Sequence, residues 1–381
     1  MKSTIKILLF FYVSIMAYFL STHQFYNADI EAYMGIVYKI SNPNMSIEEI
    51  HDKVYDELIE KKPEKFNFKI EEDVDAIGDS KYYKILSENP KIYDEELQLF
   101  TVKPFYNYVN SIFFRLGFSA SSSTFIITII SYVLIVLLIF IFLSKIISNN
   151  WIVLFLTILI SLFKPLLDAS RHATPDVLSC LLLLLSVYFL LMKKDLLWTS
   201  IFGVLCILTR PDYIVFYCLT SVLAYFFRSE MNLKSRGIFV SFFSFLISFI
   251  ILQSFNKISW SVLLMNQFVK IQWYPISNPN ALNYIDYFNL IKRKLLFEFN
   301  SSYFILLLIF IVIIYSKTFS WKNLQQRLSL FFLIIIYLTV FVRFFIFPSL
   351  VNRMMVGYYL LIIFTLIYYL NPIYKKIFIK S

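Results

Sequence analysis

Ionisable residues that could do chemistry stand in small groups at the ends of long apolar runs. These groups are Asp29/Glu31, Lys103, Arg171/His172/Asp176, Arg210/Asp212 and Arg343/Arg353. Charged side chains at the level of a membrane are costly and usually belong to functional sites. Several cations around one cavity, facing a pair of carboxylates, suit a ligand that carries a phosphate and a leaving group.

The acidic pair Asp29 and Glu31 comes a few residues after the first apolar run. Acids two residues apart cannot share one helical face, so we expect Asp29 to project into a cleft and Glu31 to support it. A carboxylate in that position can act as a general base that takes a proton from an attacking acceptor hydroxyl. Partial burial would raise its pKa toward a useful range. Taken alone, two acids in an acidic loop are usually just solvated.

Basic residues at the starts of apolar runs are candidates for phosphate binding. Lys103 precedes the second run, where its ammonium suits a phosphate, although lysines also extend to the membrane interface in this way. Arg210 opens the sixth run together with Asp212, and Arg343 and Arg353 lie on either side of the last outer turn. We predict that Lys103, Arg210 and Arg353 bind phosphate and that Asp212 supports a helix start.

The segment that opens the fourth run combines a helix start with extra charge. Thr174 is expected as the N-cap, Pro175 as the first helical residue and Asp176 as a supporting acid in the first turn. This interpretation does not account for Arg171 and His172. Because a helix N-terminus flanked by arginine is a good anion site, we predict that both residues bind phosphate.

These residues must be positioned by helices that cross a membrane. The chain has 381 residues, of which 59% are hydrophobic, and a mean hydropathy of +0.69. A soluble core cannot hide that much apolar surface, so the bilayer must act as the solvent. We predict an all-α polytopic membrane protein with about ten transmembrane helices and a long outer loop between the first and second. The expected spans are residues 5–22, 119–143, 151–167, 176–192, 196–209, 212–227, 237–254, 301–316, 328–346 and 354–370.

The distribution of charge predicts how these helices are oriented. With the N-terminus inside, the inner segments hold 14 basic residues and only two acids, Asp195 and Glu230. Residues 23–103 hold 18 of the 25 acids in the chain. This pattern obeys the positive-inside rule. We therefore expect the inner (plasma) membrane, cytoplasmic termini and an active site on the periplasmic or extracellular side. The net charge of +10 then has a membrane explanation, and no nucleic-acid partner is expected.

The predicted organisation is a single membrane domain over residues 1–381 with outer loops at 23–118 and 255–300. The acid excess of residues 23–103 and their lack of a long apolar run predict no independent core. Short helices are expected at Ile47–Ile59, after a Ser46 capping pattern, at Asp94–Phe100, and at Tyr287–Phe299 in the membrane interface. The first apolar run lacks a small-x-small cleavage site, so we expect a retained helix rather than a signal peptide.

Several classes of site are disfavoured by what the sequence lacks. The three histidines are scattered, no HExxH or CxxC spacing exists, and the three cysteines lie inside apolar runs. We therefore expect no metal site of that type and no disulfide framework. A Walker-type glycine loop is also absent, and the inner loops are too short for a catalytic domain. ATP and nucleotide sugars are therefore not expected as donors of a transferred group.

Four of these groups, in their order along the chain, resemble GT-C type glycosyltransferases, the integral-membrane class that uses polyprenyl-phosphate-linked sugars. Asp29 and Glu31 are similar to the acidic motif that this class carries in its first outer loop. Lys103-Pro104 resembles the Lys-Pro-Pro element of protein O-mannosyltransferases and lipid A aminoarabinose transferases, with Phe105 in place of the second proline. Arg171–Asp176 and the Thr-Arg-Pro-Asp-Tyr segment ending at Tyr213 resemble two further signatures. The resemblance covers roughly residues 1–220.

The resemblance implies sugar transfer, with inversion, from a polyprenyl-phosphate donor to a glycan or glycolipid acceptor on the outer face. Membrane lipids would surround the donor tail, and a divalent metal at Asp29 and Glu31 is possible, as in some relatives. Two other classes remain open. One is a surface polysaccharide (O-antigen) polymerase or ligase, which needs no acidic motif after the first helix. The other is a lipid-linked oligosaccharide flippase, which does no chemistry.

Overall fold

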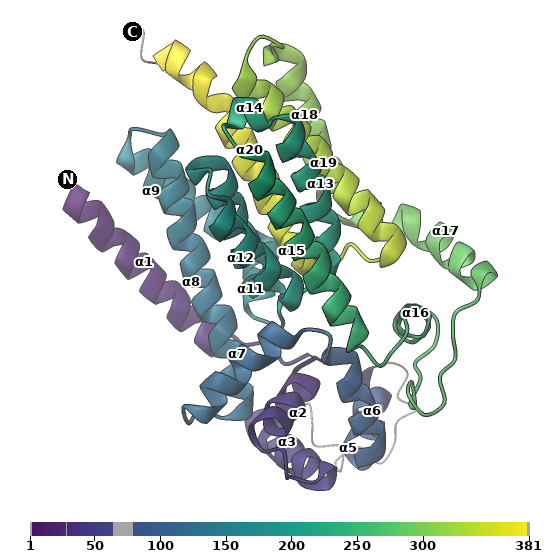
Figure 1. Cartoon of the computed structure of the whole chain (residues 1–381). Coiled ribbons are helices and arrows are strands. Elements are labelled where there is room, and N and C mark those ends of the chain that lie inside the picture. Colours follow the sequence, from purple (N-terminus) through teal and green to yellow (C-terminus); the bar gives the residue numbers. More distant parts are fainter. Residues whose placement is uncertain (1, 28, 64–78, 379–381) are drawn as a thin grey trace.

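The protein is built from helices, and the computed structural model describes residues 2–27, 29–63 and 79–378 (Figure 1). No strand is found in these ranges; two segments meet in a single isolated bridge between Phe25 and His172. The helices are α1 (Lys2–Thr22), α2 (Asp29–Ser41), α3 (Ile47–Lys61), α5 (Asp79–Glu88), α6 (Pro90–Phe100), α7 (Pro104–Arg115), α8 (Ala120–Ile146), α9 (Asn150–Ser161), α10 (Lys164–Ser170), α11 (Asp176–Tyr188), η1 (Phe189–Lys193), α12 (Leu196–Thr209), η2 (Pro211–Tyr213), α13 (Ile214–Phe226), α14 (Arg228–Met231), α15 (Ser235–Ser254), α16 (Trp260–Phe268), α17 (Tyr284–Ser301), α18 (Phe304–Thr318), α19 (Leu324–Ile346) and α20 (Asn352–Phe378).

The long apolar helices identify an all-α, multi-pass membrane protein. Within the described ranges, six helices are long and apolar enough to cross a membrane. Two more spans arise if the bent pairs α9/α10 and α17/α18 each count as one, with bends of 61° and 60°. The helices Leu196–Thr209 and Pro211–Phe226 are apolar but shorter. Most predicted spans coincide with helices, whereas 151–167 and 301–316 include the breaks within the bent pairs. In the described ranges, length and composition thus support six to eight crossings.

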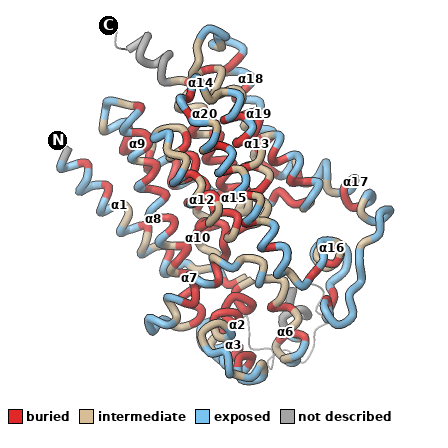
Figure 2. The backbone as a smooth tube through the Cα atoms, viewed as in Figure 1, coloured by how far each residue is buried: buried red, intermediate tan, exposed pale blue. Residues whose placement is uncertain are grey.

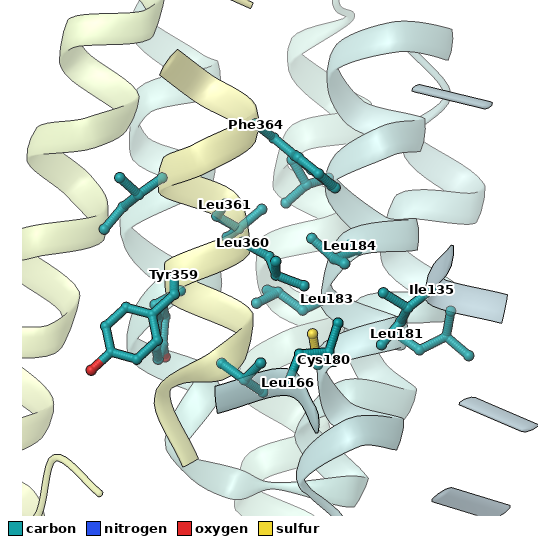
Figure 3. Packing of buried hydrophobic residues seen from close by; sticks show 14 of the residues in the cluster. Ile135, Leu166, Cys180, Leu181, Leu183, Leu184, Tyr359, Leu360, Leu361 and Phe364 are labelled. Atoms are coloured by element: carbon teal, nitrogen blue, oxygen red, sulfur yellow. The ribbon is translucent and has the colours of Figure 1, made fainter. Parts of the chain in front are cut away.

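The bundle is organised around α11, which packs against α8, α12 and α20. Figure 3 shows Leu183 and Leu184 of α11 lying against Leu360 and Leu361 of α20. Close approach of α20 depends on Gly357, where an added Cβ would lie 2.9 Å from Leu183 and 2.8 Å from the hydroxyl oxygen of Tyr213. Small residues at such crossings allow the close packing that holds membrane helices together. On the outside, α1, α15 and α18 expose apolar side chains, as expected of lipid-facing helices (Figure 2).

A second, smaller body lies at one end of the bundle and is called here the helical cap: α2, α3, α5, α6 and α7 (Figure 1). Its apolar residues form a second cluster, with Met34, Val54, Leu58 and Leu97 fully buried, and this cluster also includes Ala120 and Phe125 of α8. The cap therefore shares its apolar cluster with the bundle, and the absence of an independent core in residues 23–103 stays a prediction. The apolar residues of the cap are spaced at helical intervals among acids and lysines, so they form buried stripes without forming a long apolar run.

Acids of the cap fasten it to the rest of the chain. The carboxylate of Glu57 accepts hydrogen bonds from the backbone N–H groups of Ala120 and Ser121, at 3.2 and 2.9 Å, at the start of α8. An anion in this position is stabilised by the helix dipole. Glu95 likewise accepts from the backbone N–H groups of Ile276 and Ser277, at 2.7 and 3.2 Å. Part of the acid excess of residues 23–103 thus serves to attach the cap to the rest of the chain.

The short predicted helices are present with modest shifts of their ends. Ser46 and Glu49 form the complete capping box at the start of α3, as predicted. The helices predicted at Asp94–Phe100 and Tyr287–Phe299 begin earlier, at Pro90 and Tyr284. In contrast, α2 and α7 were not predicted. The middle of the first outer loop, residues 64–78, lies outside the described ranges.

Candidate functional site

Six charged side chains form a continuous row at the end of the bundle that meets the cap. In order they are Asp29, Arg353, Asp176, Arg210, Asp212 and Arg343, called here the charged row. Acids and arginines alternate along it, so each charge lies beside an opposite one. The row brings together residues that are up to 324 positions apart in the sequence.

The contacts along the row are short at both ends and looser in one place. Arg353 donates to Asp29 at 2.9 Å, and its Nε lies 3.9 Å from Asp176. Arg210 donates to Asp176 and, at 3.2 Å, to Asp212. Arg343 donates to Asp212 at 2.5 Å. The 3.9 Å contact is therefore the loosest of these ion pairs.

Burial divides the row into an accessible and an inaccessible part. The side chains of Asp29 and Arg353 are 24% and 21% exposed, whereas those of Asp176 and Arg343 are 4% and 1% exposed. Arg343 also donates to the backbone carbonyl of Ser349 at 2.7 Å. A buried charge is tolerated only when it is paired and hydrogen-bonded. We infer that the inner members hold the structure and that Asp29 and Arg353 can meet a ligand.

The row is assembled from helix ends, for a local reason in each case. Asp29 is the first residue of α2 and Asp176 the first of α11, where carboxylates favour the positive end of the helix. Arg210 ends α12 in an extended conformation before Pro211, which cannot continue the preceding helix. Arg353 lies in the first turn of α20. Helix ends at one level of the bundle thus bring these side chains together.

Lys103 lies next to the row, in a pocket of aromatic rings. Its ammonium donates to the hydroxyl of Tyr33 at 2.6 Å and lies 4.9 Å from the ring centroid of Phe100. Partial burial lowers the pKa of Lys103 to about 8, while the nearby carboxylate of Asp29 acts in the opposite direction. Most Lys103 side chains therefore carry a proton at pH 7, but the pKa lies only slightly above that pH. An incoming anion would strengthen that charge.

Glu31 does not join Asp29. Its carboxylate accepts a hydrogen bond from Tyr55 of α3 at 3.1 Å, and its side chain is buried in the cap. Asp29 is held instead by Arg353 and by Asn27, whose amide donates at 2.6 Å. Because residues at i and i+2 point to different sides of α2, the two carboxylates do not form a common ligand set. They do not fit a shared divalent metal, and no step is assigned to one.

Arg171 and His172 make their hydrogen bonds outside the charged row, although the charges of Arg353, Asp176 and Asp29 act on His172. The Nε of Arg171 donates to the carbonyl of His23 at 2.8 Å, so this contact ties α10 to the end of α1. His172 donates through Nδ1 to the carbonyl of Asp168 at 2.6 Å. Burial lowers the pKa of His172, so its ring is neutral at pH 7 and adds no cation. Lys103, Arg210 and Arg353 are brought together, whereas Arg171 has no described contact with the charged row.

The start of α11 differs in detail from the prediction. The helix begins at Asp176, Pro175 occupies the cap position, and no side chain caps the helix. Thr174, the predicted N-cap, donates its hydroxyl to the carboxylate of Asp176 at 2.9 Å. The hydroxyl thus orients an acid of the charged row. Proline has no polar side chain that could accept a hydrogen bond from the first backbone N–H groups. Pro175 therefore leaves the start of α11 without a side-chain cap.

Tyr33 is a site residue that the sequence reasoning did not select. It follows Asp29 by four residues, which is about one helical turn, so both side chains lie on one face of α2. Burial holds the pKa of Tyr33 well above its usual value, so the phenol keeps its proton. It can accept a hydrogen bond from Lys103 while donating one of its own. The i, i+4 spacing from Asp29 was the signal that could have found it.

Asp29, Lys103 and Arg353 together provide one acid and two cations beside a partly open surface. The carboxylate can accept a proton, and the cations can hold an oxyanion. Among the described residues, no group of three or more histidine, cysteine, aspartate or glutamate side chains is placed to hold a metal ion. The chain matches no protein-family model, and no curated protein or solved structure matches it.

Proposed function

We propose that the protein is a membrane-embedded, inverting glycosyltransferase that moves a sugar from a polyprenyl-phosphate donor to a glycan or glycolipid acceptor. The observation that carries this proposal is the placement of Asp29 beside Arg353 and Lys103 at one end of an apolar bundle. A phosphate on a membrane lipid would reach that level, and its charge would meet two cations. A carboxylate within the same group supplies the base that an acceptor hydroxyl needs.

The proposed reaction is a single displacement at the anomeric carbon. The acceptor oxygen attacks that carbon and gives its proton to Asp29. The bond between the anomeric carbon and the phosphate oxygen breaks, and its electron pair leaves with the polyprenyl phosphate. Arg353 and protonated Lys103 stabilise the departing phosphate. Because Arg353 is paired with Asp29 at 2.9 Å, an arriving phosphate competes for the guanidinium and frees the carboxylate to act as a base.

The proposal includes the orientation of the protein and about ten crossings. We place the charged row and the cap on the outer side of the plasma membrane and both termini in the cytoplasm. The 14 basic residues of the predicted inner segments support this orientation. A cysteine introduced at exposed Lys53 of the cap should react with a membrane-impermeant thiol reagent in intact spheroplasts. Reaction only after permeabilisation would reverse the orientation.

The decisive experiment compares Asp29→Asn with wild type in proteoliposomes supplied with polyprenyl-phosphate hexoses and an acceptor glycolipid extract. The variant keeps the size of the side chain and loses the base, so transfer should slow by roughly 10²–10⁴-fold. Release of polyprenyl phosphate and formation of glycosylated acceptor are both followed by mass spectrometry. Asp94→Asn, which removes a surface ion pair with Lys39 elsewhere in the cap, is the matched control and should transfer normally.

Binding separates the roles of the charged residues. Arg353→Gln should weaken polyprenyl-phosphate binding roughly tenfold, because one charge-assisted hydrogen bond is lost. Arg171→Gln should weaken it much less, since its described contact is with the carbonyl of His23. Full transfer by both Asp29→Asn and Glu31→Gln would reject the glycosyltransferase and favour a polymerase. Movement of lipid-linked sugar across the bilayer without any new glycosidic bond would favour a flippase.

A further inference from the structure

The bundle contains a cavity far from the charged row. A cavity of about 340 Å³ lies among α8, α11, η1, α13, α14, α19 and α20. Its walls are apolar, and they include Leu184, Val187, Leu223, Leu328, Phe332 and Phe364. This volume falls within the ~300–1,000 Å³ of small-molecule sites in proteins.

The helix register places this cavity at the opposite end of the bundle from the charged row. Asp176 begins α11, and the cavity wall on the same helix starts at Leu184, about 12 Å farther along at ~1.5 Å per residue. On α20, Arg353 belongs to the row, and Leu361, Phe364 and Tyr368 line the cavity. The end that holds the cavity is called here the far end. The cavity therefore belongs to a different site from the one described above.

The entrance of the cavity is polar and mainly basic. Lys194 and Glu230 are exposed and also line the cavity, so it reaches the surface between them. The ammonium of Lys145 donates to the hydroxyl of Tyr188, which forms part of the same wall, at 2.6 Å. Arg327 acts electrostatically on Glu230 and so belongs to the same neighbourhood. Three cations and one acid leave the entrance with positive charge.

Two polar atoms near the cavity have no partner within the described part of the chain. The hydroxyl of Thr220, a wall residue that is 5% exposed, makes no hydrogen bond. Helical hydroxyls normally donate to the carbonyl one turn earlier, as Ser221 does to Tyr217 at 2.8 Å. The buried Nε of Arg327 also lacks an acceptor. Buried donors without partners are costly, so a ligand with acceptor oxygens would be favoured here.

We propose that this cavity binds an anionic glycerophospholipid, with one acyl chain between the helices and its phosphate at Lys194 and Arg327. The apolar walls match a hydrocarbon chain, and the hydroxyl of Thr220 can donate to an ester carbonyl. A positively charged entrance selects an anionic headgroup over a zwitterionic one. This inference does not rest on the proposed glycosyltransferase activity, because it uses none of the residues of the charged row.

The experiment uses the full chain in nanodiscs of phosphatidylcholine that contain phosphatidylglycerol with a photoactivatable diazirine at the end of an acyl chain. After illumination, cross-links should map by mass spectrometry to cavity walls such as Val187 and Leu223. Ala224→Trp should remove these cross-links, because Ala224 is 4% exposed and lines the cavity. Val222→Trp, on the lipid-facing side of the same helix and 48% exposed, is the matched control and should retain them.

A second pair of variants tests the headgroup without filling the cavity. Lys194→Gln with Arg327→Gln should reduce labelling by phosphatidylglycerol roughly tenfold, the effect of losing charge-assisted hydrogen bonds. Lys317→Gln changes a basic residue that does not line the cavity and should have little effect. Equal labelling by diazirine phosphatidylcholine, or displacement of the probe by polyprenyl phosphate alone, would overturn the proposal. Should Ala224→Trp fail to fold, Thr220→Val takes its place. This nearly isosteric change removes the hydroxyl that donates to the ester carbonyl, so it should reduce the labelling.

Discussion

The two ends of the helix bundle treat charge in opposite ways. At the end that meets the cap, three acids and three arginines are drawn together, and Asp176 and Arg343 among them are almost completely buried. At the far end, the wall of a cavity is apolar, and charge is confined to its entrance. Burial of charge requires neighbours that satisfy it, so the first end is filled by its own side chains. The far end has room for an apolar chain from outside.

The end that meets the cap is thus the more rigid part of the bundle, and the far end is the part with internal space. Arg343 donates through Nε to Asp212 and through Nη1 to the carbonyl of Ser349, which fixes the turn between α19 and α20, and only its Nη2 has no partner among the described residues. Thr220, in contrast, has no internal hydrogen-bond partner among the described residues. We expect changes at the first end to affect stability strongly. Changes at the second end should affect ligand binding more than folding.

The largest effect is expected from breaking the buried part of the charged row. Arg343→Met should lower the free energy of unfolding by roughly 3–5 kcal/mol, because Asp212 loses a buried partner. Unfolding in detergent, followed by circular dichroism, measures the change. Arg236→Met alters an exposed arginine at the far end and should stay within about 0.5 kcal/mol. Equal stabilities for the two variants would contradict the difference between the ends.

The next effect concerns pH and depends on the lowered pKa of Lys103, which is about 8. A phosphate anion favours the protonated amine, so its affinity should be greatest below pH 8. Above that value, affinity should fall by up to about tenfold per pH unit, until the raised pKa of the complex is reached. Polyprenyl-phosphate binding between pH 6.5 and 9.5 measures this dependence. In Lys103→Gln, polyprenyl-phosphate binding should be weaker at low pH and should no longer fall in this way above pH 8.

The same group predicts the opposite trend for stability. The unfolded chain binds a proton at Lys103 up to its usual pKa of about 10.4, whereas the folded protein releases it near pH 8. Between these values the unfolded state holds more protons, so this residue makes the free energy of unfolding rise with pH. Comparison of wild type with Lys103→Gln over that range isolates the contribution. A fall with pH in the wild type relative to the variant would contradict the lowered pKa.

A smaller effect should come from the attachment of the cap. Glu57→Gln removes the negative charge at the start of α8 and keeps an acceptor oxygen for only one of the N–H groups of Ala120 and Ser121, which donate to different carboxylate oxygens. The loss should be about 1 kcal/mol, as for other charges at helix N-terminal ends. Hydrogen exchange in α3 and the first turn of α8 would detect it. Glu60→Gln, an exposed change on the same helix, is the control.

The smallest effect is expected at the far end. Thr220→Val replaces a hydroxyl that has no described partner, so thermal stability should change by less than about 0.5 kcal/mol or increase slightly. The same detergent unfolding assay measures it. A loss of several kcal/mol would show that the hydroxyl is satisfied within the folded chain. That result would erase the contrast with Arg343.

The sequence predicted the long helices well because a membrane span needs about 20 apolar residues, which are visible in the chain itself. It also predicted that Asp29, Lys103, Asp176 and Arg210 lie at one level, because each stands at a helix end. The apolar cluster of the cap was harder to see in the sequence, because its apolar residues are dispersed among charges and pack partly against α8. The sequence did not indicate that Glu31 would meet Tyr55 of α3, because proximity to Asp29 does not determine which side of α2 faces the bundle.

The amino-acid sequence is enough to show that this protein has many apolar helices and that acids and bases stand at their ends. The physical reason is local: apolar runs partition into a bilayer, and charged residues are excluded from its centre. Which charges become partners follows from the packing of the helices, because the ion pair of Arg353 with Asp29 joins residues 324 positions apart. The rotation of each helix about its axis set those partners, and packing against neighbouring helices sets that rotation.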